Sequence, residues 1–352
     1  MKINKFKFLI IFIILNKYVY FKYNTNNKKI GIIGLAHSQN VGNNLLKYAF
    51  FIKLTELGFS PYIVGNKLLN HNISFLFNFT KIRLINEFSE IKEKDFDILI
   101  VSSDQTWNAE YKKSYLYNIA FLKFAEDWKV KKFIYGASLV FEKWKFSKED
   151  EKIAKHLLQN FSGISVREKN SVRLIEENIG FKTQLVLDPT FLINKDYYIN
   201  LIKNYQSQII KQINNKDFIF VYILNNSSKV EKYLTIVKNH LKLNIFYLTI
   251  FDKNQVKEFL YGIINSKAVI TDSFHGTVFS IIFKKPFICL HKKNNDNRFN
   301  DLAEIFNIQN RIFYLNSTLP ISLLKQKLIF NETKLIILKR ESINYLKKNL
   351  YR

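Results

Sequence analysis

The sequence predicts an α/β protein built from two doubly wound, Rossmann-like domains that face each other across a cleft. Short apolar segments alternate with segments of helical spacing, and polar or turn residues follow each apolar segment. The series is interrupted once, by a polar join near 193–215. With only 4 Pro and 10 Gly in 352 residues, little material is left for a flexible linker, so the two halves should pack closely.

The first series gives a doubly wound domain over residues 30–192. Its expected strands are 30–35, 61–64, 97–102, 133–136, 163–166 and 185–187, and its clearest helices are 43–57 and 169–178. In the first helix, Leu45, Tyr48, Ala49 and Ile52 share one face, and Gly58 is a suitable C-terminal stop.

The second series gives a domain over residues 193–317, preceded in the chain by the first domain and followed by a helical segment. Its expected strands are 217–224, 244–250, 268–271 and 287–290, with helices over 229–241, 253–266 and 276–283. Helices between successive strands imply parallel sheets with right-handed crossovers. The polar segment 318–352 has helical spacing, and we expect it to cross back onto the first domain.

The chain is strongly basic, with 54 Lys and Arg against 29 Asp and Glu, a net charge of +25. This excess suits an anionic partner such as a phosphate ester, an acidic glycan, a lipid headgroup surface or a nucleic acid. It is equally compatible with an AT-rich coding bias and a solvated surface. No recognisable nucleic-acid module is present, so no nucleic-acid partner is expected.

The single cysteine, Cys289, lies in an apolar strand segment and is expected to be a buried core thiol. One cysteine allows no intrachain disulfide and no Cys-based zinc site, which favours a reducing, cytoplasmic compartment. The 6 histidines show no metal-ligand spacing, so no metal is expected.

Residues 1–29 form a basic and apolar extension. The apolar run 8–15 is too short to span a bilayer, and lysines flank it on both sides. Two interpretations remain: a segment lying in the interface of an anionic inner leaflet, or an extra helix packed on the body of the protein.

A strand, a polar turn and a short helix over residues 267–290 have the layout of an anion-binding site. Asp272 and Ser273 are good N-cap residues, and the amides near His275, Gly276 and Thr277 would face a ligand in front of the helix. A histidine beside such a cradle, at the carboxyl end of a strand, is well placed for acid/base chemistry on a phosphorylated ligand.

Several strand-end segments together resemble the polysaccharide pyruvyl transferase family. The most specific are Ser-Asp-Gln-Thr-Trp-Asn at 103–108, Ser-Val-Arg-Glu at 165–168 and Ser-Phe-His-Gly at 273–276; segments 39–49, 135–138 and 186–190 follow the family's order. The resemblance covers about residues 30–315. It implies a GT-B-like pair of domains and transfer of the pyruvyl group of phosphoenolpyruvate onto a glycan as a ketal, with phosphoenolpyruvate as co-substrate and no cofactor.

Ketal formation requires protonation of the enol carbon, attack of a sugar hydroxyl on C2 and loss of phosphate. His275 is the expected general acid/base, the alternative being a histidine that only hydrogen-bonds the turn. The resemblance places a ligand-binding arginine at Arg167, the alternative being a surface pair with Glu168. Asp104 is a candidate base for the acceptor hydroxyl, or a residue that orients its loop.

Donor and acceptor contacts are expected from separate loops. Ser273, Gly276 and Thr277 would donate to phosphate unless they serve only as a helix cap, and Arg298 is a second candidate cation unless it lies in a solvated loop. Acceptor sugar contacts are expected from Asn40, Gly42, Asn43, Asn44, Gln105, Trp107 and Asn108, with Trp107 stacking on the ring. An Asn-rich turn chosen for its backbone geometry is the alternative for residues 40–44.

The expected partners are phosphoenolpyruvate and a glycan or lipid-linked oligosaccharide, with peripheral contact to the inner membrane face. A GT-B glycosyltransferase using a nucleotide sugar and a non-catalytic glycan-binding relative are the competing interpretations. No acidic ribose-binding signal is evident around 217–270, which favours the pyruvyl donor. The acceptor sugar is not identified by the sequence.

Overall fold

The computed structural model describes residues 28–34, 40–66, 78–207, 209, 216–225, 227–248, 255–291, 297–314 and 320–351. The predicted N-terminal extension falls outside these residues, apart from its last two.

The first sheet is parallel and has the strand order β3-β2-β1-β4-β5. Its strands are β1 (Lys29–Ile33), β2 (Ser60–Asn66), β3 (Ile82–Ile85), β4 (Ile98–Val101) and β5 (Lys131–Ile134). The helices of this half are α2 (Val41–Glu56), α4 (Lys113–Phe121), α5 (Lys148–Leu158) and α6 (Lys169–Ile179). Strands β2 and β3 are added on one side of β1, and β4 and β5 are added on the opposite side of β1. Ligands of such folds bind at this switch point, outside the carboxyl ends of the strands.

A separate two-stranded sheet follows the first. It consists of β6 (Ser165–Val166) and β7 (Gln184–Leu185), which pair in parallel. Single bridges, Lys132 with Phe161 and Ala137 with Val166, align it with the β5 edge. The strands expected at 163–166 and 185–187 therefore exist, but they are shorter than expected and form their own small sheet.

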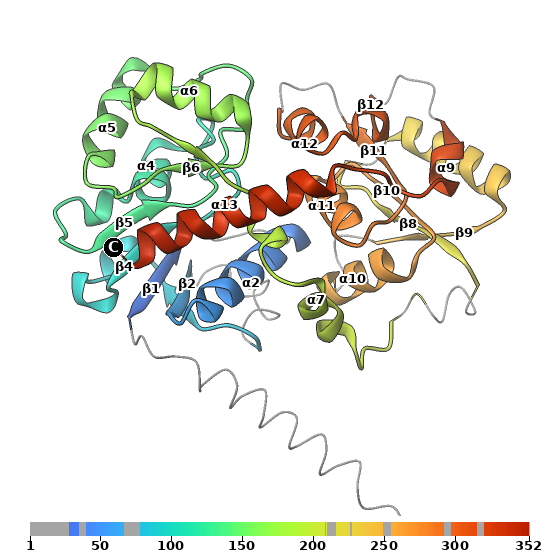
Figure 1. Ribbon diagram of the computed structural model, residues 1–352, viewed down its shortest axis with the longest axis horizontal. Helices are drawn as coiled ribbons and strands as arrows, with labels where there is room; N and C mark the ends of the chain where they lie inside the picture. The colour runs from blue at the N-terminus through green and yellow to red at the C-terminus, as the bar shows by residue number, and fades with distance from the viewer. Residues whose placement is uncertain are drawn as a thin grey trace, which may run out of the picture.

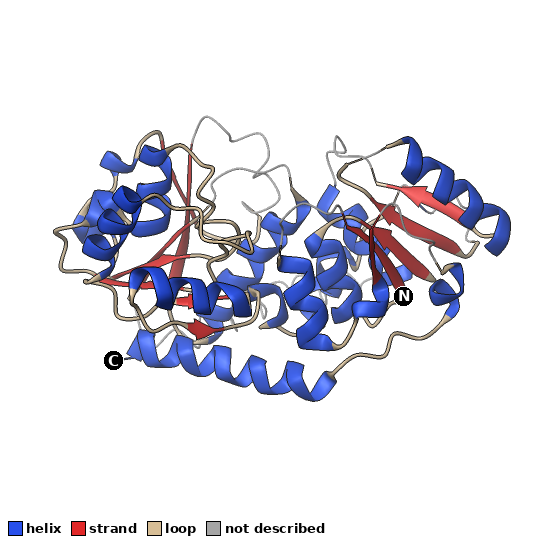
Figure 2. Ribbon diagram, turned by 90° about the horizontal axis from the view of Figure 1, so that it is seen from above, coloured by secondary structure: helices blue, strands red, loops and turns tan. Residues whose placement is uncertain are grey.

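The second sheet is also parallel, in the order β12-β11-β10-β8-β9. Its strands are β8 (Phe218–Tyr222), β9 (Asn244–Tyr247), β10 (Ala268–Thr271), β11 (Phe287–His291) and β12 (Ile312–Tyr314). Its helices are α9 (Ser228–Leu241), α10 (Gln255–Asn265), α11 (Phe274–Ile282) and α12 (Arg298–Phe306). Figures 1 and 2 show helices on both faces of each sheet, the α/β arrangement that the sequence predicts.

Burial on both faces explains the composition of the central strands. All residues of β4, β8, β10 and β11 are buried, including Cys289, which is a core thiol as predicted. Parallel strands covered by helices on both sides have continuous apolar runs because neither face meets water. Six short 3₁₀ segments complete the described fold: Phe88–Glu90, Glu93–Asp95, Lys123–Ala125, Pro189–Phe191, Gln309–Arg311 and Ile321–Lys325.

Helices α2 and α7 (Lys195–Ile202) hold the two halves together. Tyr198 of α7 is fully buried; its ring meets Phe279 of α11 edge-on at 4.9 Å and Tyr48 of α2 at 6.3 Å. The Tyr198 hydroxyl donates to the carbonyl of Thr190 at 2.8 Å, which satisfies its polar end. The N-terminal end of α2 is thereby held against α11.

The last helix, α13 (Glu332–Tyr351), runs from the second half onto the first (Figure 1). Tyr345 donates from its hydroxyl to the carbonyl of Ile134 at 2.7 Å, and Ser342 accepts from the amide of Leu187 at 2.8 Å. A Cβ at Gly163 would lie 2.7 Å from Asn349 Oδ1, so the absence of a side chain there lets α13 approach.

Candidate active site

The segment between β10 and α11 forms a strand-turn-helix unit with His275 in its first turn. The Ser273 side chain caps α11 by accepting from the amide of Gly276 at 3.3 Å, and the Thr271 hydroxyl accepts from the amide of Ser273 at 3.0 Å. A Cβ at Gly276 would lie 2.2 Å from Thr271 Oγ1. The glycine is therefore required so that the helix can pack tightly on the strand end.

Asp272 joins this turn to the end of β8. Its carboxylate accepts from the amides of Leu224 and Asn225 at 2.6 and 2.9 Å. These hydrogen bonds fix the two strand ends that border the site, so Asp272 has a structural role.

His275 is buried between the two halves of the molecule. A Cβ at Gly42 would lie 2.1 Å from His275 Nδ1, so the ring packs directly on the first turn of α2. Its Nε2 lies 3.7 Å from Asp188 Oδ2, beyond hydrogen-bond distance, and no described residue hydrogen-bonds to Nε2. A buried ring nitrogen in this position is available to a ligand.

Asp188 is held on the first half by its own chain segment. Its Oδ1 accepts from the amide and hydroxyl of Thr190 at 3.0 and 2.7 Å, and its Oδ2 accepts from Arg167. Burial opposes ionisation of this carboxyl, but His275 and Arg167 outweigh burial and hold the pKa of Asp188 well below its usual value. His275 therefore faces an anionic carboxylate.

Arg167 lies behind the site with its guanidinium fully committed to carboxylates. It donates through Nη2 to Asp104 at 2.9 Å, through Nη1 to Asp188 and through Nε to Glu168 at 3.4 Å. Its side chain is only 2% exposed, and the guanidinium stacks on the Phe274 ring at 4.5 Å. Arg167 does not line the cavity described below, and direct contact with the ligand stays a prediction. The pair with Glu168 exists, but it is buried and not the surface pair of the alternative interpretation.

Asp104 has a left-handed backbone, with φ of 84°, which is strained for a residue with a side chain. Its carboxylate pairs with Arg167 and lies 3.9 Å from Arg298 Nη1. Burial would raise the pKa of Asp104, but Arg167, His275 and Arg298 together keep it below its usual value. A carboxylate stabilised in this way is a weak base, so Asp104 fits the loop- and cation-orienting alternative better than the predicted role as acceptor base.

A cavity of about 250 Å³ lies between the two halves, in front of α11. The first half contributes Asn40, Asp104 and Gln105, and the second contributes Leu224, Asn225, Asp272, Ser273, Phe274, His275, His291, Arg298 and Phe299. Arg298 is the first residue of α12, not part of a loop, and its side chain is 12% exposed. The predicted second cation therefore faces this cavity.

Several predicted contacts are not in this cavity. Trp107 is fully buried, donates from Nε1 to the carbonyl of Ala120 at 3.3 Å and packs edge-on against Phe121. The prediction that it stacks on a sugar is therefore wrong. Thr277 is also fully buried, and its hydroxyl donates to the carbonyl of Ser273. With Gly276, it supports the cap and does not line the cavity.

The remaining predicted acceptor residues surround the N-terminus of α2 and the loop after β4. Asn40 caps α2 by accepting from the amide of Gly42 at 2.8 Å, while Asn43 and Asn44 are buried in its first turn. Asn108 donates to Gln105 Oε1 at 3.3 Å and accepts from the amide of Glu110. Of these residues, only Asn40 and Gln105 line the cavity between the halves.

Two aromatic residues of the cavity were not predicted. His291 ends β11, and its ring packs on Phe299 with centroids 4.5 Å apart. The rule that selected His275, a polar residue at the carboxyl end of a parallel strand, also selects His291. Phe299 carried no sequence signal, because α12 was not predicted.

Comparison with known proteins agrees with this geometry. The family model described as polysaccharide pyruvyl transferase matches residues 9–291. The chain belongs to the polysaccharide pyruvyl transferase family. A search of curated proteins found no match.

Solved structures show that this pyruvyl transferase family member has the GT-B fold. A UDP-GlcNAc 2-epimerase from Neisseria meningitidis bound to UDP-GlcNAc superposes with a TM-score of 0.55 at 11% identity, covering 92% of this chain and 99% of that one. The S. aureus MnaA–UDP co-structure gives 0.54 at 14% identity, covering 93% and 97%. Arabidopsis thaliana UGT89C1 complexed with UDP-L-rhamnose gives 0.52 at 8% identity, covering 92% and 96%. At these identities the likeness concerns the fold alone.

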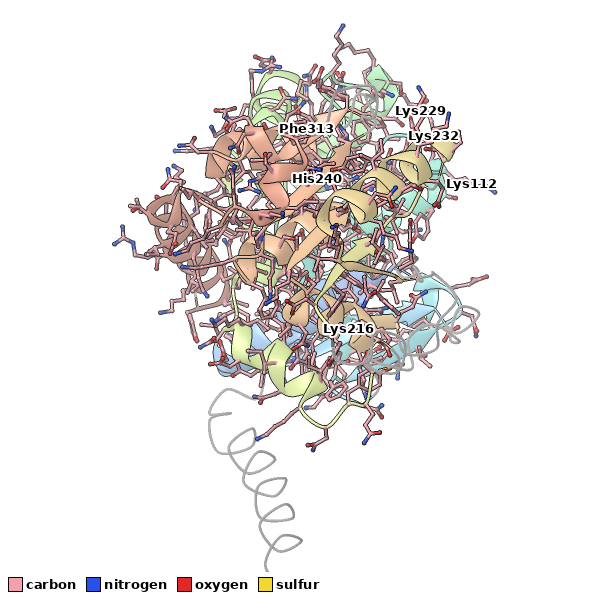
Figure 3. The ribbon with its side chains drawn as sticks, turned by 90° about the vertical axis from the view of Figure 1, so that its right-hand side faces the viewer. Lys112, Lys216, Lys229, Lys232, His240 and Phe313 are labelled. Atoms are coloured by element: carbon pink, nitrogen blue, oxygen red, sulfur yellow. The ribbon has the colours of Figure 1, made fainter. Side chains whose placement is uncertain are left out.

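The surface of the pyruvyl transferase is lysine-rich. Lys229 and Lys232 project from α9 on the outer face of the second half (Figure 3). Within the described ranges, no helix is both long and apolar enough to cross a membrane, and no group of His, Cys, Asp and Glu has a metal-binding arrangement.

Proposed function

We propose that the protein transfers the pyruvyl group of phosphoenolpyruvate onto a sugar of a polysaccharide or its lipid-linked precursor, forming a ketal. One observation carries this proposal: His275, whose buried Nε2 has no hydrogen-bond partner among the described residues, lines the same cavity as Arg298. Family membership supports pyruvyl transfer in general, and the identity of the donor and the bond formed are our inference.

The volume of the cavity favours a small donor. About 250 Å³ lies just below the usual range for pockets that bind drug-sized ligands, about 300–1,000 Å³. This space suits a three-carbon phosphate ester better than a nucleotide sugar. The N-terminus of α11 and the Arg298 guanidinium provide positive charge for its phosphate and carboxylate.

In the proposed reaction, the imidazolium of His275 donates a proton to the methylene carbon of phosphoenolpyruvate while a sugar hydroxyl attacks C2. Phosphate then leaves C2, and a second hydroxyl of the same sugar closes the ketal. Asp188 lies 3.7 Å from His275 Nε2 and stabilises the imidazolium, and Arg167 keeps Asp188 anionic. Asp104 orients Arg298 over the cavity, with the Phe274 ring beneath both arginines.

Phosphoenolpyruvate is a cytoplasmic metabolite, so we propose that the reaction takes place in the cytoplasm. We further propose that the basic extension at 1–29 brings the enzyme to the inner membrane face, where a lipid-linked acceptor would be presented.

The test is incubation of the purified protein with phosphoenolpyruvate and a panel of synthetic and lipid-linked glycans, with phosphate release and the mass of the glycan measured together. Stoichiometric phosphate and pyruvyl ketal are expected. Phosphate release without a pyruvylated product would contradict transferase function, and sugar transfer from a nucleotide sugar in parallel reactions would favour the glycosyltransferase alternative.

His275→Gln should lower kcat by about 10²- to 10⁴-fold, the usual contribution of a general acid or base, without changing the melting temperature substantially. His156→Gln is the matched control, because His156 is exposed and pairs with Glu126 far from the cavity. Equal activity of the two variants would remove His275 from the reaction.

A further inference from the structure

A second, narrow pocket adjoins the donor cavity on the side of the first sheet. It is lined by Ile32, Gly34, Asn43, Leu46, Lys47, Ile63, Val64, Ser102, Ser103 and Asp104. Asp104 also lines the donor cavity, so the two spaces meet at this residue. With about 10 Å³ available, the pocket has room for one water-sized group such as a sugar hydroxyl.

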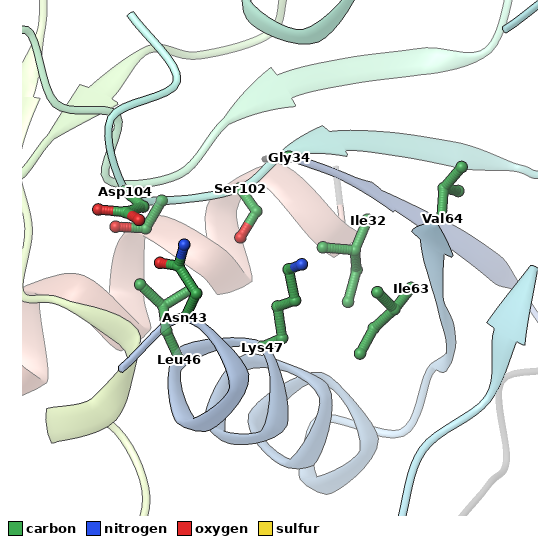
Figure 4. Close-up of a pocket in the computed structure, with 10 residues that line it drawn as sticks. Ile32, Gly34, Asn43, Leu46, Lys47, Ile63, Val64, Ser102 and Asp104 are labelled. Atoms are coloured by element: carbon green, nitrogen blue, oxygen red, sulfur yellow. The ribbon is translucent and has the colours of Figure 1, made fainter. Parts of the chain in front are cut away.

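Two polar side chains face this pocket. Lys47 extends from α2 toward Gly34, and the Ser102 hydroxyl at the end of β4 is turned toward the same space (Figure 4). Ser102 is 2% exposed, and no described residue hydrogen-bonds to its Oγ. A buried hydroxyl in this state indicates that a polar group of a ligand or a water completes the pocket.

A larger hollow of about 720 Å³ continues beyond the pocket along the same sheet edge. It shares Gly34 and Val64 with the pocket, and its outer walls include Asn86, Tyr115 and Asn118. Amide and aromatic side chains are the groups that bind sugars through hydrogen bonds and ring contacts. The pocket that Lys47 lines thus shares residues both with a space large enough for a glycan and with the cavity assigned to the donor.

We propose that Lys47 is a further catalytic residue, which accepts the proton of the attacking acceptor hydroxyl while Ser102 hydrogen-bonds that hydroxyl. This inference rests on the proposed pyruvyl transfer and extends it to the acceptor side. Asp104 lines both spaces, the pocket with Lys47 and the donor cavity with Arg298.

The chemistry of Lys47 suits this role. Its burial among Ile32, Ile63 and Val64 lowers the pKa of Lys47 to about 8, despite the opposing effect of Asp104. A substantial fraction of the amine is therefore neutral at physiological pH and can take a proton.

Lys47 and His275, together with solvent, account for every proton moved in the reaction. The first hydroxyl gives its proton to the Lys47 amine as its oxygen bonds to C2, and His275 gives a proton to the methylene carbon, which becomes a methyl group. The C2–O bond to phosphate then breaks with its electron pair on phosphate, which takes a proton from solvent. The second hydroxyl attacks C2 and returns its proton to His275, and Lys47 releases its proton to solvent.

Lys47→Met and Lys47→Arg are the decisive variants, with Lys232→Met on the exposed face of α9 as control. Both Lys47 variants should lose about 10²- to 10⁴-fold in kcat while binding phosphoenolpyruvate with unchanged Kd, because arginine keeps the charge but cannot act as a base. In the wild type, kcat/KM should rise with pH through about 8. In Lys47→Ala, a small primary amine such as methylamine should restore part of the rate.

Retained activity of Lys47→Arg, or a pH profile in Lys47→Met that equals the wild type, would overturn this assignment. Failure of the proposed function gives a different result, since the wild-type protein itself would then form no pyruvylated product with any acceptor. Loss of phosphoenolpyruvate binding in Lys47→Met would also overturn the assignment of Lys47 as acceptor base, because this result would place Lys47 on the donor side.

Discussion

His275 and Asp188 face each other across 3.7 Å, although one belongs to the helix after β10 and the other to the segment after β7. The imidazole comes from the second half of the molecule and the carboxylate from the first. Arg167 binds the same carboxylate from behind. Arg167 and His275 thus converge on the Asp188 carboxylate.

Gly42→Ala should abolish most activity by displacing His275. The added Cβ would lie 2.1 to 2.6 Å from three atoms of the His275 side chain, while alanine itself is favourable in a helix. We expect a loss of at least about 10²-fold in kcat/KM, comparable to removal of an acid/base group.

A double-mutant cycle tests the cause of the Gly42→Ala effect. In a His275→Gly background, both the ring and its Cβ are absent, so Gly42→Ala should no longer reduce the free energy of unfolding measured with urea. An equal stability loss in both backgrounds would show that the glycine serves another contact.

Arg167→Met should destabilise the fold by about 3–5 kcal/mol at neutral pH, because it leaves buried carboxylates without their counter-ion. Arg167 contributes to the lowered pKa values of Asp104 and Asp188, so its stabilising effect is present above the unfolded carboxyl pKa and is lost as pH falls through the folded values. Urea unfolding should therefore show the difference from wild type narrowing in acid below about pH 4. A constant difference at every pH would argue against the ionic explanation.

Asp301→Asn should stabilise the protein at neutral pH. Asp301 of α12 lies near the N-terminus of α6, and burial together with the charge of Glu168 raises its pKa to about 6. A raised carboxyl pKa makes the folded state more stable at low pH, and this advantage is lost as pH rises through about 6.

The asparagine variant has no charge to bury, so its gain over wild type should grow between about pH 4 and pH 6 and stay constant above, at about 1–2 kcal/mol after a discount for partial solvent access. Thermal unfolding at pH 4 and pH 8 measures it. Equal stabilities at both pH values would contradict the assignment, and Glu177→Gln, which removes an exposed carboxylate paired with Arg173, is the control.

Trp107→Phe should affect stability and leave acceptor KM unchanged. The buried indole would lose volume and its hydrogen bond to the carbonyl of Ala120, which we expect to cost about 1–3 kcal/mol. A raised acceptor KM with unchanged stability would restore the stacking role that the structure argues against.

The sequence predicted the alternation of elements well, because continuous apolar strands and one-sided helices have distinct patterns. Helix α5 was missed although Ser147 and Asp150 form a capping box at its start, a signal that was present and not used. The strands β3 and β12 are short, edge-placed and only partly buried, so their apolar pattern is weak.

At the site, residue type and strand-end position were enough to select His275, Ser273 and Arg298. They were not enough to assign the role of Arg167, whose partners Asp104 and Asp188 are distant in the chain and were known only as separate strand ends. The predicted stacking of Trp107 on a sugar was not found for a related reason. A polar motif suggests exposure, but the side chains within the motif point in different directions. Lys47 gave no signal, because a single lysine on a helix is ordinarily solvated.

The arrangement around Gly42 has a mechanical consequence. His275, the proposed proton donor, belongs to the second half, while Gly42, on which its ring packs, and Asp188 belong to the first. A hinge motion that moves the two halves apart must also separate the His275 imidazole from Asp188. An open enzyme would therefore bind its substrate without the proposed acid in place. Such an enzyme would be protected against wasteful hydrolysis of an energy-rich phosphate until both halves engage.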